Sequence, residues 1–146
     1  MKADAKTEAE VMAVFNKLIE AFTQRDLDSG LTLFASDPDI VFIGTGRDEK
    51  SIGLAEIKGE VERAWAQSEQ ASIQLGWHSV SAAGSVAWVA ADAIIRAKVK
   101  GQEISFPIRW TIVMERRGDK WLVVQSHDSM PAASQKEGES WPIESS

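Results

Sequence analysis

The first part of the chain carries apolar side chains at intervals that favour an α-helix. Between residues 7 and 24 they recur every three or four positions, at Val11, Val14, Phe15, Leu18, Ile19 and Phe22. This spacing puts them on one face of a helix, where they can pack against a core. Thr7 followed by Glu10 is typical of a capping box and predicts where the helix starts.

Two further helices are predicted before residue 70. A short one is expected over residues 27–34, and Pro38 follows it in a turn sequence that ends it. Residues 40–44 form an apolar run that predicts a short buried strand, and residues 44–53 read as a loop. The third helix is predicted over residues 54–67, with apolar positions at Leu54, Ile57, Val61 and Trp65.

After residue 70 the apolar period changes from helical to two, which is typical of β-strands. Four successive strands are predicted, over residues 71–81, 85–100, 102–117 and 120–130. The turns between them are short, so the strands should form an antiparallel meander. The predicted fold class is therefore α+β, with three N-terminal helices packed on a curved antiparallel sheet.

The composition is that of an ordinary globular domain. The 146 residues are 44% hydrophobic and 26% charged, which predicts one domain over residues 7–131. Residues 1–6 are expected to be disordered, and residues 132–146 form a polar tail that Trp141 could dock. The net charge of −6 argues against nucleic acid or a membrane as a partner. No cysteine and no signal peptide are found, which fits a cytoplasmic protein.

The two short turns also predict which side chains share a face of the sheet. Placing residue 99 opposite 102, and 116 opposite 121, aligns Ala91, Trp110 and His127 in one row. Large side chains opposite alanines on this face would leave a hollow that the helices could cover, so we assign it to the interior. The face carries Ala87, Val89, Ala91, Ala93, Ile108, Trp110, Ile112, Met114, Val123, Gln125 and His127. A third hairpin, with residue 82 opposite 85, would add His78.

The opposite face is unusually apolar for a sheet surface in water. It carries Trp77, Trp88, Ala90, Asp92, Arg109, Thr111, Val124 and Asp128. An exposed patch of this kind often marks an interface, so we predict a homodimer packed through it. Asp92, Arg109 and Asp128 would form an ion triad there; alternatively, Arg109 could bind the carboxylate of a ligand.

Several of these residues resemble the SnoaL-like branch of the nuclear transport factor 2-like superfamily. That branch shows an Arg-x-Thr in the penultimate strand, here Arg109 and Thr111. It also shows a Trp and then a His-x-Ser in the last strand, here Trp121, His127 and Ser129. The resemblance covers residues 7–131. It implies a cone-shaped α+β barrel with a deep pocket, frequent homodimers and a wide range of activities.

The chain also departs from individual members of the superfamily. Ketosteroid isomerases need a carboxylate base near the first strand, and a Tyr plus a protonated Asp as oxyanion donors. This chain has no Tyr, and Phe42 stands about where that base would be. The calcium/calmodulin-dependent kinase association domain has a His where Gln125 stands here. Dehydratase-type chemistry would pair a His with an Asp across the pocket, whereas the predicted register separates His127 from Asp128.

His127 is the candidate catalytic residue, because a histidine can exchange protons near neutral pH. Alternatively, it is a hydrogen-bonded residue that closes the pocket, and His78 is exposed near a turn. Two histidines without a metal-ligand spacing do not predict a metal site, and we expect no cofactor. The charged run 47–50 is a solvated loop or a lid over the pocket.

Three functions remain open from the sequence. The first is a domain that binds a small ligand, either apolar or bearing a carbonyl or carboxylate, with ligand-binding residues Trp110, Gln125, His127, Trp65, Phe15 and His78. The aromatic residues among them could equally be plain core. The second is a cofactor-independent isomerase, cyclase or dehydratase in which His127 moves a proton. The third is a homodimerisation module with a vestigial pocket, whose interface would contain Trp77, Trp88, Asp92, Arg109 and Asp128.

Overall fold

A six-stranded sheet and three helices make up the fold of the computed structural model, which describes residues 1–143. The helices are α1 (Ala5–Gln24), α2 (Leu27–Leu31) and α3 (Leu54–Ala66). The strands are β1 (Val41–Ile43), β2 (Lys50–Ile52), β3 (Gln70–Ala83), β4 (Val86–Val99), β5 (Gln102–Arg117) and β6 (Lys120–Ser129). The sheet order is β2-β1-β6-β5-β4-β3, so the sheet has two edges and does not close.

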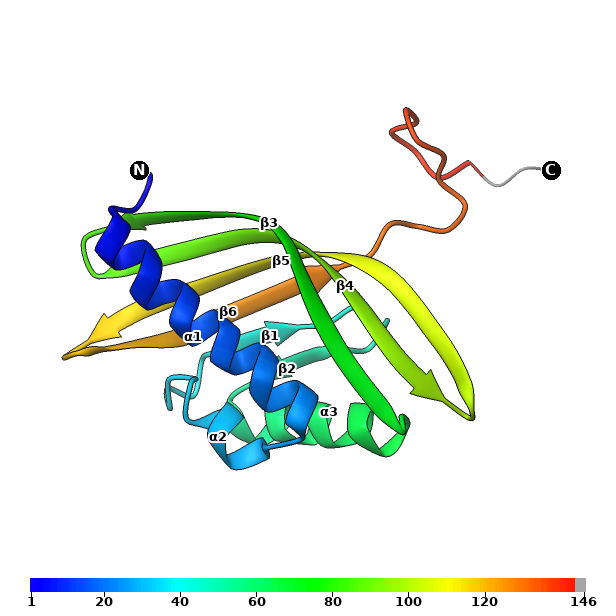
Figure 1. Cartoon of the computed structure of the whole chain (residues 1–146), viewed down its shortest axis with the longest axis horizontal. Helices are drawn as coiled ribbons and strands as arrows, with labels where there is room; N and C mark the ends of the chain where they lie inside the picture. The colour runs from blue at the N-terminus through cyan, green and yellow to red at the C-terminus, as the bar shows by residue number, and fades with distance from the viewer. Residues whose placement is uncertain (144–146) are drawn as a thin grey trace.

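The four long strands form the predicted antiparallel meander, which confirms the α+β class. They curve strongly, and α1 lies across the sheet while α2 and α3 lie below it (Figure 1). The sequence did not predict β2, which lies in the expected loop 44–53 and pairs with β1. β1 in turn runs parallel to β6, so these short strands extend the sheet beside α3.

The start of α1 differs from the prediction. Asp4, not Thr7, is the N-cap, and its carboxylate accepts a hydrogen bond from the Thr7 backbone N–H at 2.8 Å. Glu10 reaches the sheet instead, where it accepts a hydrogen bond from the Trp121 indole N–H at 3.0 Å. Ahead of the helix, Lys2 bridges Ser81 on the edge of β3. These contacts place the N-terminal residues against the sheet, although the sequence predicted that residues 1–6 are disordered.

The core lies between α1 and the concave face of the sheet. Val11 and Phe15 on α1 are fully buried, as the helical period predicts. The sheet contributes the predicted inner residues of β4 and β5, each at most 6% exposed: Ala87, Val89, Ala91, Ala93, Ile108, Trp110, Ile112 and Met114. The predicted pairings of Ala91 with Trp110 and of Asp92 with Arg109 are both confirmed.

A β-bulge in β6 changes the second half of that strand. Met114 pairs with Val123, as the turn predicts, but Val113 then pairs with Gln125. Val124 is the extra residue, and a single extra residue reverses which face the following side chains occupy. The predicted row of Ala91, Trp110 and His127 is therefore wrong at its last member.

The pairing beyond the bulge shows the consequence of that reversal. Trp110 now stands opposite Asp128, and Thr111 stands opposite His127. Ser126, which was not assigned to the interior, is fully buried. Gln125 and His127 are exposed on the convex face of the sheet. The bulge thus exchanges the imidazole for a carboxyl on the concave face.

The C-terminal segment leaves the sheet after β6. Residues 130–143 contain neither helix nor strand, and Figure 1 shows them extending away from the domain. The Trp141 side chain is 76% exposed, so it does not dock the tail. Residues 144–146 of the predicted tail lie outside the described residues. Within residues 1–143, no helix is both long and apolar enough to cross a membrane.

Candidate functional site

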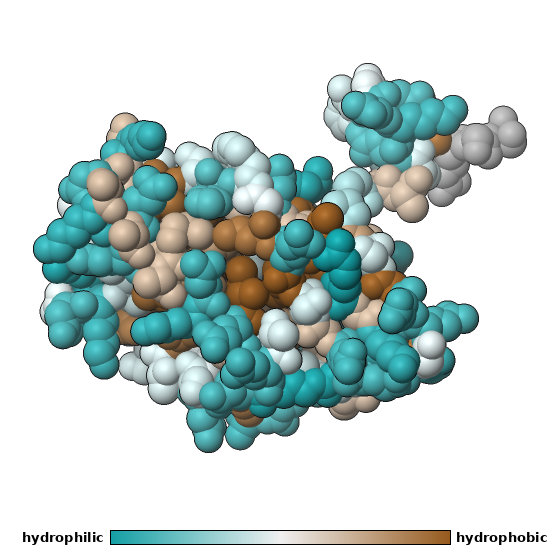
Figure 2. Space-filling view, viewed as in Figure 1, coloured by the Kyte–Doolittle hydropathy of each residue, from teal (hydrophilic) through white to brown (hydrophobic). Residues whose placement is uncertain are grey.

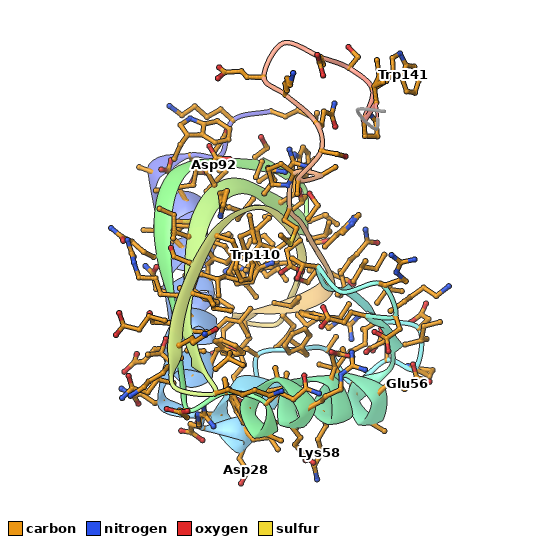
Figure 3. All side chains as sticks on the ribbon, turned by 90° about the vertical axis from the view of Figure 1, so that its right-hand side faces the viewer. Asp28, Glu56, Lys58, Asp92, Trp110 and Trp141 are labelled. Carbon is orange, nitrogen blue, oxygen red and sulfur yellow. The ribbon has the colours of Figure 1, made fainter. Side chains whose placement is uncertain are left out.

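A cavity of about 390 Å³ opens between the helices and the concave face of the sheet. Figure 2 shows its apolar floor as a brown hollow at the centre of the molecule, and in Figure 3 the sheet curves around the space above α3. Its walls are apolar side chains from α1, from α3, from the first half of β3, from the second half of β4 and from the first part of β5. Among them are Leu18, Phe22, Val61, Trp65, Ile73, Ile95, Phe106, Ile108 and Trp110. The cavity is within the size range of small-molecule sites.

Two tryptophans shape the cavity. The Trp110 ring lies 4.7 Å from the Phe15 ring, measured between centroids, and its indole N–H donates to Ser126 Oγ at 2.9 Å. Trp65 lies 6.1 Å from Phe22 on the same measure. The indole N–H of Trp65 is buried and has no hydrogen-bond partner among the described residues. The Trp110 side chain is therefore held in place in the cavity wall by these two contacts. The indole N–H of Trp65 is available to donate a hydrogen bond to a ligand.

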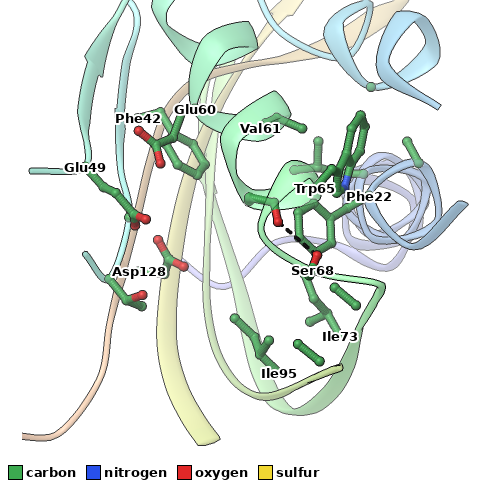
Figure 4. A pocket seen from close by; sticks show the side chains of 18 of the residues that line it. Phe22, Phe42, Glu49, Glu60, Val61, Trp65, Ser68, Ile73, Ile95 and Asp128 are labelled. Atoms are coloured by element: carbon green, nitrogen blue, oxygen red, sulfur yellow. Dashed lines mark hydrogen bonds between the residues drawn. The ribbon is translucent and has the colours of Figure 1, made fainter. Parts of the chain in front are cut away.

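Three carboxyl groups meet at one side of this apolar cavity. Glu49 comes from the loop between β1 and β2, Glu60 from the middle of α3, and Asp128 from the end of β6. Figure 4 shows the three side chains pointing toward one another, with Phe42 beside Glu60. Asp128 stands opposite Trp110 in the sheet, so its carboxyl is at the polar end of the cavity.

The environment of Asp128 favours its neutral form. Burial, together with a smaller contribution from the negative charge of Glu49, raises the pKa of Asp128 to about 7, and a hydrogen bond from its own backbone partly opposes this rise. Asp128 Oδ1 is buried and has no hydrogen-bond partner among the described residues. Burial likewise raises the pKa of Glu60, with Glu49 again contributing. Near neutral pH, Asp128 can both give and take a proton.

Arg63 holds the far side of this carboxyl cluster. Its guanidinium donates to Asp48 at 2.9 and 3.2 Å and to Glu60 at 2.9 and 3.2 Å. It lies 3.7 Å from Glu49 Oε1. Arg63 is not among the residues that line the cavity. Arg63 therefore anchors Glu60 and the loop from behind, and no Lys or Arg of the described residues is among the groups that shift the pKa of Asp128.

The predicted ligand-binding residues divide into three groups. Trp65 and Trp110 line the cavity. Phe15 is fully buried behind Trp110 and does not reach it. Gln125, His127 and His78 are exposed and lie outside its lining, His127 because of the bulge. In the third hairpin residue 82 pairs with 87 and not with 85, and β3 has a register shift before His78.

The predicted ion triad on the convex face does not form. Asp92 stands opposite Arg109, but Asp128 lies on the other face of the sheet. The Arg109 Nε–H donates to Ser129 Oγ at 3.2 Å. Among the ion pairs of residues 1–143, none joins Arg109 to either carboxylate. Arg109 is also not among the residues that line the cavity. The predicted alternative, in which Arg109 binds the carboxylate of a ligand, therefore has no support at this cavity.

Glu49 and Glu60 are site residues that the sequence did not predict. Glu60 had a detectable signal, because it lies within one helical turn of Ile57 and Ala64 on the inward face of α3. Glu49 had none beyond its place in the charged run 47–50, for which a lid was one of two interpretations. Within the described part of the chain, no three His, Cys, Asp or Glu side chains are grouped so that they could hold a metal ion.

Solved structures with the same fold have diverse descriptions. A nuclear transport factor 2-like superfamily protein from Salmonella enterica is 20% identical, with a TM-score of 0.82 over 95% of this chain and 100% of that one. A proposed dehydratase from Streptomyces avermitilis is 18% identical, with a TM-score of 0.80 over 89% and 100%. A proposed aromatic ring hydroxylase from Novosphingobium aromaticivorans is also 18% identical, with a TM-score of 0.80 over 88% and 92%.

The TM-scores establish the common fold, and identities this low do not transfer an activity. A comparison with curated proteins gives no match. The family model described as the SnoaL-like domain matches residues 11–133, which include all six strands and the three carboxyl groups of the cavity. The chain therefore belongs to the SnoaL-like domain family and has the nuclear transport factor 2-like, cystatin-like fold.

Proposed function

We propose that the cavity binds a small, largely apolar, uncharged molecule and that Asp128 exchanges a proton with it. The reaction class is that of a cofactor-independent isomerase, cyclase or dehydratase. The observation that carries the proposal is the Asp128 carboxyl: it faces an apolar cavity, its Oδ1 has no partner among the described residues, and its pKa is raised to about 7. In this proposal Asp128 has the role that the sequence suggested for His127.

The chemistry of a buried acid supports this assignment. A catalytic acid or base works best when its pKa lies near the working pH, because both protonation states are then populated. The apolar walls give the carboxyl a surrounding of low dielectric constant, which strengthens the hydrogen bond between a neutral carboxyl and a ligand oxygen. The unpartnered Oδ1 of Asp128 would then gain its missing partner when the ligand binds.

The charges around the cavity narrow the ligand class. Every ionisable side chain among the lining residues is acidic, namely Asp26, Glu49, Glu60 and Asp128. A ligand carboxylate would be desolvated beside these groups with no lining cation to pair it. A ketone or aldehyde oxygen would instead accept a hydrogen bond from neutral Asp128. The proposal therefore keeps the carbonyl-bearing ligand and drops the carboxylate.

The step balances as an enolisation in which neutral Asp128 gives its proton to the ketone oxygen while a solvent molecule takes the α-hydrogen, and the reverse step returns both protons. The test is therefore whether the protein speeds the exchange of a ketone's α-hydrogens with the solvent. Uncharged apolar ketones that fill about 390 Å³ are incubated with the protein in D₂O near pH 7, and loss of the α-hydrogen signal is followed by NMR. We expect at least one ketone to exchange faster with the protein than without it. We expect Asp128→Asn to reduce the catalysed rate by roughly 10²- to 10⁴-fold.

His127→Ala is the matched control, because it changes the adjacent residue on the opposite face. It should keep the wild-type rate. Faster exchange that survives Asp128→Asn, or that disappears in His127→Ala, would assign the proton transfer elsewhere. Absence of catalysed exchange with every ketone shown to bind would contradict the enzymatic part of the proposal.

We also propose that a second copy of the chain packs on the convex face of the sheet. Trp77 is 62% exposed and Ile94 is 37% exposed, and Trp88 of β4, which pairs with Ser81, is partly buried. Large apolar side chains on an open sheet face are typical of an interface. We expect Trp77→Arg to shift the protein from dimer to monomer in sedimentation experiments.

Trp141→Arg provides the control for this substitution, because Trp141 is equally large and 76% exposed but lies on the C-terminal segment. It should leave the sedimentation coefficient unchanged. A wild-type protein that remains monomeric at high concentration would contradict the proposed pairing. So would a Trp77→Arg variant that remains dimeric.

A further inference from the structure

The loop between β1 and β2 holds the Glu49 carboxylate in a defined place. Glu49 Oε2 accepts a hydrogen bond from the Gly46 backbone N–H at 2.7 Å. The Gly44 N–H donates to the Glu49 backbone carbonyl at 2.9 Å, and this bond closes the loop. The Glu49 side chain is 26% exposed, and its other oxygen faces Arg63 at 3.7 Å. The loop therefore directs this carboxylate inward, although the residues around it are exposed.

Two glycines make room for that carboxylate. A Cβ atom at Gly44 would collide with Glu49 Oε2, and a Cβ at Gly46 would lie 2.6 Å from Glu49 Cδ. Neither glycine has a positive φ, so backbone conformation does not explain why a glycine is there. A side chain at either position would instead have to displace the Glu49 side chain. Gly44 and Gly46 thus leave the space that the Glu49 carboxylate occupies, and we call this arrangement of the two glycines around the carboxylate its seat.

The seat places Glu49 next to Asp128 and Glu60 (Figure 4). The groups around Asp128 are Glu49 from the loop, Glu60 from α3 and Trp110 from β5. Arg63 binds Glu60 and Asp48 from outside the lining and lies closer to them than to Glu49. A fixed negative charge beside a buried carboxyl disfavours ionisation of that carboxyl.

We propose that Glu49 is a positioning residue whose carboxylate, seated against Gly44 and Gly46, keeps a proton on Asp128. The inference rests on the proposed function, because it assigns Glu49 the task of preparing Asp128 as a proton donor. The negative charge of Glu49 then favours the protonated form of the buried Asp128 carboxyl. Glu49 acts through Asp128 and does not need to touch the ligand.

The experiment measures the titration of Asp128 directly. Protein labelled with ¹³C at the aspartate carboxyls is titrated by NMR, and the Asp128 signal is identified by its loss in Asp128→Asn. We expect Glu49→Gln to lower the Asp128 midpoint by roughly one pH unit, because it removes the neighbouring negative charge. Glu49→Asp restores the charge on a shorter side chain and should recover part of that shift.

The glycine seat is tested by moving the carboxylate without removing it. Gly46→Ala should also lower the Asp128 midpoint, because the new methyl group displaces Glu49. Gly59→Ala is the matched control, since a Cβ at Gly59 would meet nothing within 4 Å. It should leave the midpoint unchanged. A midpoint that stays within about 0.2 units in Glu49→Gln, or that moves as far in Gly59→Ala, would overturn the proposal.

This measurement separates the inference from the proposed function. The Asp128 midpoint is read without substrate, so it can move with Glu49 even if no ketone ever exchanges. Conversely, if exchange occurs and depends on Asp128 but Glu49→Gln leaves both the midpoint and the pH–rate profile unchanged, Asp128 is the acid and Glu49 has no part in preparing it.

Discussion

Replacing Trp110 with alanine is expected to lower the free energy of unfolding by roughly 3–5 kcal/mol. The side chain is only 6% exposed, and its ring packs on that of Phe15 at 4.7 Å. Alanine would remove an aromatic side chain that stands between the cavity and Phe15. The space left would join the existing cavity, and little of it could close, because the strands on both sides are held by their ladders. Urea denaturation followed by circular dichroism measures the loss.

Two variants separate the packing and hydrogen-bond contributions of Trp110 to stability, and a third serves as a control. Trp110→Phe keeps an aromatic ring against Phe15 and should cost much less. Ser126→Ala leaves the Trp110 indole N–H buried without its partner, which costs about 1–3 kcal/mol. Trp77→Ala changes an exposed tryptophan and should be measured below any dimer dissociation constant, where about 0.5 kcal/mol or less is expected. A Trp110→Ala variant as stable as Trp77→Ala would show that Trp110 is not part of the packed wall.

Replacing Asp128 with asparagine is expected to stabilise the protein at alkaline pH. The pKa of Asp128 is raised from 3.8 to about 7 in the folded chain. Between these values the folded state binds more protons than the unfolded state, so the free energy of unfolding falls as pH rises. The stability linked to this carboxyl is thus fully present below about pH 4 and is lost by the time the pH passes 7. Asparagine has a similar shape and no charge, so it avoids that loss.

The size of the effect follows from the shift in pKa. A shift of this size corresponds to a difference on the order of 2–4 kcal/mol between the variant and wild type at pH 8.5, relative to their difference at pH 4. Chemical denaturation at a series of pH values measures both curves. Asp92→Asn, an exposed carboxyl on the convex face, is the control and should follow the wild-type curve. Parallel curves for Asp128→Asn and wild type would mean that Asp128 ionises freely in the folded chain.

The burial of the Asp128 carboxyl explains both its cost to protein stability above pH 7 and its proposed role in proton exchange. Ionisation of this buried acid costs stability, because desolvation disfavours its charge and its Oδ1 has no hydrogen-bond partner among the described residues. Such groups are typical of functional sites, where a ligand supplies the missing partner. The comparison of Asp128→Asn in stability and in proton exchange tests this trade-off within one variant.

The amino-acid sequence by itself determined the α+β class and most of the element boundaries. Helical spacing of apolar residues predicted the buried face of α1, and alternation in β4 and β5 predicted their concave residues. The turns after Val99 and Arg117 also placed the first pairs of both hairpins correctly. These features are local, because the period of the side chains follows from the backbone of the element itself. The alternation within β5 was therefore enough to put Trp110 on the concave face.

Only the tertiary structure decided which polar groups enter the cavity. The bulge at Val124 turns Asp128 inward and His127 outward, and neither residue carries a local mark of it. A bulge forms because pairing with β5 and β1 and burial of Ser126 favour it over an uninterrupted ladder, and such contacts are distant in sequence. Glu49 likewise reaches Asp128 through a loop that Arg63 and two glycines hold. The apolar walls of the cavity thus follow from local periodicity, whereas its acidic end depends on long-range pairing that no local pattern encodes.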